Sequence, residues 1–252
     1  MFPVLNLGFI SLPIPEFLIL IGFWLGSVIS DHKAKLFSVE PKLLEKIIWW
    51  SLIAGILGAR LSYVARFPAA FKGDWLSLFS LNLAFLDSPS GIIIALAVSF
   101  IIISREKISL YSILDGLTPF FGIMITLFFL SQFASGNGFG TATNLPWGIS
   151  LWGEMRHPVQ LYFAFASILT ILIILHPKTM DHIIPGKTFR QFALITSGYL
   201  LLLSYFQITT LPTISGFRLD QILYWIILCF SLFLYANKYQ LNRLGITNET
   251  KK

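Results

Sequence analysis

The run from Arg156 to Tyr162, with the sequence RHPVQLY, groups side chains that could bind an anion and move a proton. Arg156 carries a planar guanidinium that matches phosphate oxygens, and His157 can gain or lose a proton near neutral pH. Gln160 and Tyr162 could hydrogen-bond a lipid headgroup. The alternatives are a loop arginine, a helix-capping histidine and polar side chains that only hold helices together.

A second candidate group lies inside an apolar segment. Arg60 stands about one turn before the end of the run Leu44–Val64, and an ionisable residue within such a span is a candidate functional residue. It could instead extend to the surface, or pair with Asp87 or Asp115. We expect Asp115 to cap the helix that follows it. Gln221, at the start of the last apolar run, could bond a headgroup or a neighbouring helix.

The segment from Ala134 to Gln160 is the longest loop that the sequence predicts. Its first part, GNGFGTATN from Gly136 to Asn144, could turn at its glycines and direct backbone N–H groups at an anion, or form a flexible surface loop. Trp147 and Trp152 follow, and their amphipathic rings suit a membrane interface. If the protein has an active site, we expect it at this loop.

Membrane-spanning helices must position these residues. Hydrophobic residues make up 56% of the 252 residues and charged residues only 12%, and mean hydropathy is +0.77, whereas soluble domains have about 25% charged residues. A span needs about 20 apolar residues, so the length predicts an all-α polytopic bundle of about seven spans. The expected spans are Ile14–Ile29, Leu44–Val64, Leu83–Ile103, Leu117–Phe133, Leu161–Leu175, Phe192–Leu211 and Ile222–Tyr235.

The basic residues predict the orientation, since Lys and Arg in short loops stay on the cytoplasmic side. Most of the 18 Lys and Arg residues lie in alternate loops, which begin near Lys33, Arg105 and Lys178, and in the tail from Lys238. The N-terminus is therefore expected outside and the C-terminus in the cytoplasm. This orientation places the long loop on the outer face.

We expect a single integral membrane domain over residues 1–252, ending in a short basic cytoplasmic tail at 236–252. The histidines show no metal-ligand spacing and no nucleotide-binding glycine motif is present, so no metal and no cofactor is predicted. The net charge of +6 favours anionic lipid as a partner over nucleic acid. The single cysteine, Cys229, is expected to be buried and inert.

The motif HPVQLY, about ten residues after NLPWGI, resembles a signature of the bacterial prolipoprotein diacylglyceryl transferases. The run Gly58–Tyr63, GARLSY, is similar to a second family motif, and Asp115, Pro119 and Gln221 also resemble family positions. The resemblance covers most of the chain. It implies the family's seven-helix membrane fold with the N-terminus outside, in agreement with the charge distribution.

This resemblance implies an enzyme that moves a diacylglyceryl group from phosphatidylglycerol to the thiol of a lipobox cysteine. The product would be a thioether, formed at the outer leaflet of the bacterial plasma membrane by a multi-pass protein. The partners would be phosphatidylglycerol or another anionic lipid, and a lipoprotein precursor or another membrane subunit. The implied site residues are Arg156 and His157 for catalysis, and Arg60, Tyr63, Asn144, Gln160, Tyr162 and Gln221 for lipid binding.

Several positions that are charged in the family carry other residue types here. These positions align with Phe129, Asn137, Thr141, Phe163, Leu200, Ser204 and Gln207. The segment 84–91, where the family has a histidine, contains none. Two hypotheses follow: a transferase with a reduced set of charged residues, or a non-catalytic descendant that binds a lipid or lipoprotein or packs as a membrane subunit.

Overall fold

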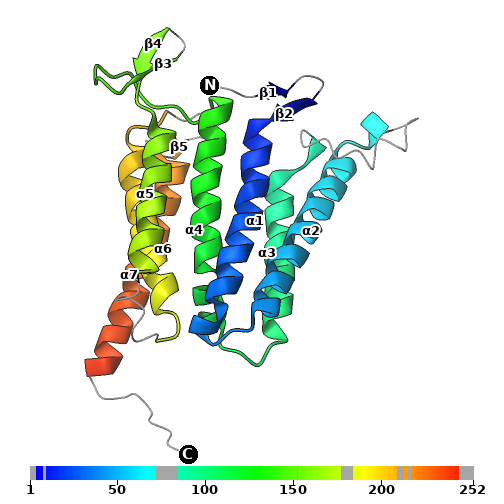
Figure 1. Cartoon of the computed structure of the whole chain (residues 1–252), viewed down its shortest axis with the longest axis vertical. Helices are drawn as coiled ribbons and strands as arrows, with labels where there is room; N and C mark the ends of the chain where they lie inside the picture. Colours follow the sequence, from blue (N-terminus) through cyan, green and yellow to red (C-terminus); the bar gives the residue numbers. More distant parts are fainter. Residues whose placement is uncertain are drawn as a thin grey trace, which may run out of the picture. The chain divides into compact units, whose positions relative to one another are not determined.

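The computed structural model describes residues 4–7, 10–71, 85–151, 153–176, 184–208, 213–214 and 217–243. The helices are α1 (Ile14–Ala34), α2 (Pro41–Arg66), α3 (Ser88–Ser104), α4 (Leu110–Ser135), α5 (Val159–Ile174), α6 (Lys187–Ser204) and α7 (Leu219–Arg243) (Figure 1). Three antiparallel hairpins pair β1 (Val4–Leu7) with β2 (Ile10–Pro13), β3 (Ile149–Leu151) with β4 (Glu154–Arg156), and β5 (Thr213–Ile214) with β6 (Phe217–Arg218). Two short 3-10 helices are η1 (Lys35–Phe37) and η2 (Pro68–Phe71).

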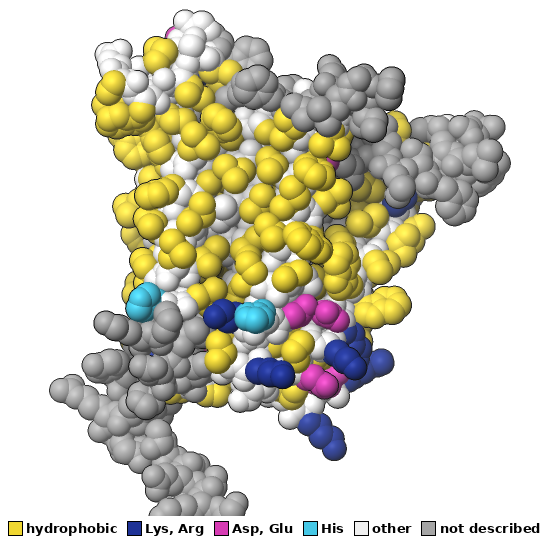
Figure 2. Space-filling view, in the orientation of Figure 1, with side chains coloured by type: hydrophobic (Ala, Val, Ile, Leu, Met, Phe, Trp, Pro, Cys, Tyr) yellow, Lys and Arg dark blue, Asp and Glu magenta, His cyan; other side chains and the backbone are white. Residues whose placement is uncertain are grey.

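The helices have the composition of membrane spans. α1, α2, α4 and α7 each contain a stretch long and apolar enough to cross a bilayer, and α3 and α5 are shorter apolar helices. Large side chains such as Phe100 and Leu202 are about 70% exposed, which suits lipid contact. Figure 2 shows hydrophobic side chains along the helices and charged ones near the helix ends. The predicted helical membrane bundle is confirmed.

Three details of the predicted elements were wrong. α4 begins at Leu110 and not at the expected Leu117. The segment between these two residues mixes polar and apolar side chains, but it contains the fully buried Ile113, which favours the helix there. Asp115 therefore lies inside α4, fully buried, and does not cap it. Cys229 is exposed on α7, since this helix presents apolar side chains outward over much of its length.

The described residues fall into two compact units, one of residues 30–116 and one of residues 1–29 with 117–252. In the unit 30–116, α2 packs on α3 through small residues. A Cβ at Gly91 would lie 2.8 Å from the Cβ of Ala59, and the hydroxyls of Ser51 and Ser99 are 2.7 Å apart. Small residues and interhelical hydroxyl bonds are the usual means by which helices associate in lipid.

The start of α3 carries a polar cluster around Asp87. Its carboxylate accepts hydrogen bonds from Ser90, from Ser62 at 3.2 Å and from Arg66 at 3.1 Å. These contacts lower the pKa of Asp87, and the hydrogen bond from Ser90 has the largest effect. Desolvation by burial acts in the opposite direction, and the positive charge of Arg66 lowers the pKa further.

We predict an acid-sensitive stability from this cluster. Because the folded state lowers the pKa of Asp87, its stabilisation is present above the unfolded value and is lost as pH falls through the folded value. In thermal melts of the detergent-solubilised protein between pH 7 and pH 3, the wild type should lose more stability than Asp87→Asn. Parallel pH profiles for the two proteins would contradict the prediction.

In the other unit, α4 packs on α1 and α5, and α5, α6 and α7 lie side by side (Figure 1). The ring of Phe129 stacks on that of Phe163 at 4.4 Å, and both belong to a buried cluster with Val159 and Ala164. The hydroxyl of Ser167 donates to the carbonyl of Gly122 at 3.0 Å. These contacts fix the start of α5 against the end of α4.

α4 ends in a Schellman motif, which sets the direction of the loop that follows. Gly136 has φ of 79°, a left-handed conformation that favours glycine. Its N–H donates to the carbonyl of Phe133, and the N–H of Asn137 donates to the carbonyl of Gln132 at 3.0 Å, which is the double bond pattern of this motif. The turn leaves the carbonyl of Asn137 available to a side chain of α5.

Candidate functional site

The loop after α4 is held by backbone pairing on both sides. On one side, Gly140 donates to the carbonyl of His157 at 3.1 Å and His157 donates back to Thr141 at 3.0 Å. On the other side, Thr141 donates to Phe206 at 2.8 Å. The segment therefore connects the residues just before α5 with those just after α6. A Cβ at Gly140 would lie 2.5 Å from the carbonyl oxygen of His157, so only glycine fits there.

His157, Tyr162 and Trp147 form a chain of hydrogen bonds at the start of α5. The indole N–H of Trp147 donates to the Tyr162 hydroxyl at 2.8 Å, and this hydroxyl lies 3.3 Å from Nδ1 of His157. Because the Tyr162 oxygen accepts from Trp147, its own O–H is available to donate to Nδ1, so we assign the ring proton to Nε2. His157 can then donate through Nε2.

The Tyr162→Phe substitution should change the tautomer population of His157. Without the phenol, Nδ1 loses its donor and the preference for the Nε2–H tautomer weakens. The measurement is the ¹⁵N chemical shift of the two ring nitrogens in detergent-solubilised protein, with Tyr205→Phe as the control, because Tyr205 is 78% exposed. An unchanged tautomer ratio in Tyr162→Phe would refute the assignment.

Arg156 is the last residue of β4, and its guanidinium already has an acidic neighbour. It donates to Glu154 at 2.6 Å and lies over the ring of Phe139, 5.2 Å from its centroid. The Glu154 side chain is 57% exposed, against 15% for Arg156. The buried Nε of Arg156 has no hydrogen-bond partner among the residues that the structure describes. A ligand phosphate could therefore bind Arg156 by displacing a solvent-exposed carboxylate.

Gln160 lies in the first turn of α5 and is only 1% exposed. Its Nε2 donates to the carbonyl of Asn137 at 2.7 Å. This bond fixes the orientation of the Gln160 amide, because a carbonyl oxygen can accept a hydrogen bond only from the amide nitrogen and not from the amide oxygen. Gln221, at the start of α7, donates to the Ser204 hydroxyl at 3.4 Å.

Beside Gln221 lies an ion pair that was not predicted from the sequence. Arg218 donates through Nε and Nη2 to both carboxylate oxygens of Asp220. Its Nη1 donates to the carbonyl of Ser204 at 2.9 Å and to that of Gln207 at 2.6 Å. The signal in the sequence was an arginine two residues before an aspartate at the start of an apolar run.

Within the described residues, the contacts that build this group do not involve the remaining predicted site residues. Asn144 is an exposed residue of the loop, and Trp152 is outside the described residues. Arg60 and Tyr63 belong to the unit 30–116. Arg60 is 8% exposed and donates to the carbonyl of Phe85 at 3.0 Å.

An aromatic group surrounds Arg60 at the end of α2. The guanidinium carbon lies 5.4 Å from the ring centroid of Phe71 and 5.6 Å from that of Phe85. The ring of Tyr63 lies 5.6 Å from that of Phe85. Aromatic faces attract a guanidinium, so Arg60 is held inside the unit and does not extend to the surface.

The comparison with known proteins identifies the family. A family model described as prolipoprotein diacylglyceryl transferase matches residues 4–237, which is most of the chain. The chain belongs to the prolipoprotein diacylglyceryl transferase family. The family resemblance seen in the sequence is thereby confirmed.

The relatives that carry the name phosphatidylglycerol–prolipoprotein diacylglyceryl transferase include proteins of three different bacteria. The protein of Finegoldia magna is 27% identical over 63% of this chain and 64% of the relative, a little under two thirds of its length. The protein of Rickettsia felis is 29% identical over 81% of this chain and 80% of the relative. That of Tropheryma whipplei is 32% identical over 49% of each.

Proposed function

We propose that the protein transfers a diacylglyceryl group from phosphatidylglycerol to a cysteine thiol of a lipoprotein precursor. Membership of the family supports this reaction, and so does the grouping of Arg156, His157, Gln160 and Tyr162 at the start of α5. The observation that carries the proposal is that Arg156, paired only with the solvent-exposed Glu154 among acidic side chains of the described residues, directly precedes His157, whose Nδ1 lies 3.3 Å from the Tyr162 hydroxyl. Both groups suit an anionic leaving group.

The reaction is a displacement at carbon. A bond forms between the cysteine sulfur and the terminal carbon of the diacylglyceryl group. The bond from that carbon to the phosphate oxygen breaks. The thiol proton goes to the leaving phosphate, which departs as glycerol phosphate. The negative charge grows on the phosphate oxygens, where Arg156 and the Nε2–H of His157 provide electrostatic stabilisation.

We further propose that both compact units belong to one integral membrane domain of seven spans in the bacterial plasma membrane. The distribution of Lys and Arg supports an outside N-terminus and a cytoplasmic C-terminus. This orientation places the loop after α4 at the outer leaflet. In the same proposal, Arg60, Tyr63, Asn144 and Gln221 contact the lipid.

The experiment uses the purified full chain in membranes that contain phosphatidylglycerol and a lipobox peptide. We expect the peptide to gain the mass of one diacylglyceryl group, and Arg156→Ala and His157→Ala each to slow the gain about 100-fold. Glu154→Gln should speed it, since it removes the carboxylate that competes for Arg156. No mass gain beside an active relative would overturn the proposed reaction.

A further inference from the structure

A cavity of about 200 Å³ lies between the end of α5, the first half of α6 and the second half of α7. It is at the other end of α5 from His157, because α5 has 16 residues and a helix of that length extends over about 24 Å. Aliphatic side chains form most of its wall, and two polar side chains complete it. The lining residues are Ile173, Ile174, Gln191, Leu194, Ile195 and Tyr235.

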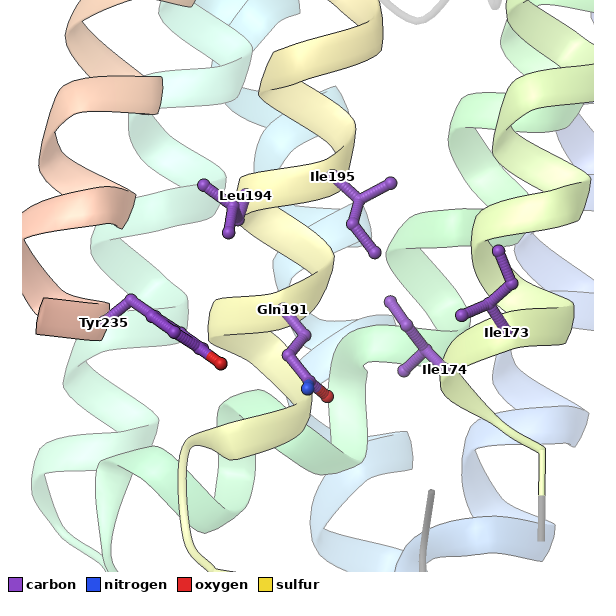
Figure 3. A pocket seen from close by; sticks show the side chains of 6 residues that line it. All are labelled: Ile173, Ile174, Gln191, Leu194, Ile195 and Tyr235. Atoms are coloured by element: carbon purple, nitrogen blue, oxygen red, sulfur yellow. The ribbon is translucent and has the colours of Figure 1, made fainter. Parts of the chain in front are cut away.

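The two polar side chains of this wall face each other. Figure 3 shows that Tyr235 extends from α7 toward Gln191 on α6, with Ile174 of α5 on the other side of the amide. In the part of the chain that the structure describes, neither the Gln191 amide nor the Tyr235 hydroxyl makes a hydrogen bond. Both groups can donate one. The pair therefore suits a ligand that brings uncharged acceptors, such as ester carbonyls.

Lys187 places a positive charge on the same face of α6. It is the first residue of the helix, and residues four apart, such as Lys187 and Gln191, lie one above the other. An ammonium has three donors, so it can bind a phosphate in addition to a protein acceptor. The sequences of α5 and α6 contain no Asp or Glu, and the one acidic residue of α7 is Asp220, at the opposite end of that helix.

The order of these groups along α6 matches the layers of a phospholipid. Four residues of helix span about 6 Å, and the interfacial region on each side of a bilayer's hydrocarbon core is about 5–8 Å thick. A phosphate beside Lys187 would thus place ester carbonyls near Gln191 and Tyr235, and an acyl chain beside Leu194 and Ile195. Anchoring at the membrane interface would explain Lys187 and Tyr235 singly, but not the aliphatic cavity beside them.

We propose that this cavity binds one phospholipid with an anionic headgroup, from the leaflet that surrounds the end of α5. Lys187 binds the phosphate, Gln191 and Tyr235 donate to the ester carbonyls, and an acyl chain fills the aliphatic part. In the proposed orientation this is the cytoplasmic leaflet. The lipid contacts three helices and stabilises their packing. The site takes no part in the reaction at His157.

The test measures the binding of phosphatidic acid and phosphatidylcholine with identical acyl chains to the purified full chain, by native mass spectrometry. We expect phosphatidic acid to bind about fivefold more tightly, the effect of one basic residue on an anionic lipid. Lys187→Gln should remove this preference. Gln191→Leu should weaken both lipids about fivefold, because both carry ester carbonyls. Lys107→Gln is the control, since Lys107 is an exposed residue of the unit 30–116.

Two further variants locate the bound lipid. Ile195→Trp fills the cavity from a residue that is 36% exposed, so it should block both lipids, and it serves if Lys187→Gln or Gln191→Leu does not fold. Arg156→Ala should leave the preference for phosphatidic acid unchanged, which separates this site from a lipid bound near His157. In thermal melts, phosphatidic acid should raise the melting temperature of the wild type more than that of Ile195→Trp.

Four results would overturn the proposal. The first is equal affinity of the wild type for the two lipids, and the second is wild-type binding in Lys187→Gln and Gln191→Leu. The third is competition by free glycerol phosphate at the affinity of the lipid, which would assign the site to a soluble phosphate. The fourth is a protein dimer that Ile195→Trp dissociates, which would assign this face to a second copy. Lipid binding without peptide transfer would overturn the proposed reaction alone.

Discussion

Replacing Arg218 by methionine should lower the free energy of unfolding by about 3–5 kcal/mol, the cost typical of removing one partner of a buried ion pair. The side chains of Arg218 and Asp220 are only 17% and 10% exposed, so Asp220 would retain an uncompensated charge. The carbonyls of Ser204 and Gln207 would also lose a donor. Denaturant titration of the protein in mixed micelles measures the change.

The control for this prediction is Lys46→Met, which removes an exposed ion pair. Lys46 and Glu106 are 3.3 Å apart with side chains 51% and 30% exposed, and such pairs contribute about 0–1 kcal/mol. Asp220→Leu combined with Arg218→Met should recover part of the loss, because no charge stays buried. A loss in Arg218→Met no larger than that in Lys46→Met would show that the pair is not structurally important.

The Gly140→Ala substitution should reduce peptide transfer about 100-fold, the scale of a 1 Å misplacement near a reacting group. The new Cβ would lie 2.5 Å from both the His157 oxygen and Cγ2 of Val159, so the backbone at the start of α5 must move. Stability should fall by about 1–3 kcal/mol, as in other overpacked sites. Transfer rate and unfolding free energy are the two measurements.

Gly198→Ala is the matched control, because a Cβ at Gly198 would meet no atom within 4 Å. Gly198 lies inside α6, where alanine is the better helix former by about 1 kcal/mol, so this variant should be as active as the wild type and slightly more stable. If Gly140→Ala matched it in both measurements, the close approach at His157 would have no functional role.

The helices and the grouping at α5 could be predicted from the sequence because both are local. Apolar runs determine spans wherever they occur, and HPVQLY keeps its side chains within two turns of one helix. Gln160 belongs to this local group and is buried in the first turn of α5. The family resemblance then gave the chemistry for which these residues are suited.

The partners of these side chains could not be predicted, because they come from distant parts of the chain. Gln160 reaches the carbonyl of Asn137, 23 residues earlier, only because the turn after α4 lies beside the start of α5. Arg218 reaches the carbonyl of Ser204 only because α6 and α7 are neighbours. Asp115 was misplaced because the fourth helix begins earlier than its apolar run.

The Schellman turn at Gly136 also controls which hydrogen-bonding group the buried Gln160 side chain presents. The carbonyl of Asn137 sets the orientation of this amide, because it accepts a hydrogen bond from Nε2. A residue that disfavours the left-handed turn at Gly136 would withdraw this carbonyl and allow the amide to rotate by half a turn. A donor would then stand where the amide now has its buried acceptor, so a mutation in the loop could reverse the hydrogen-bonding polarity of a position on α5 that is itself unchanged.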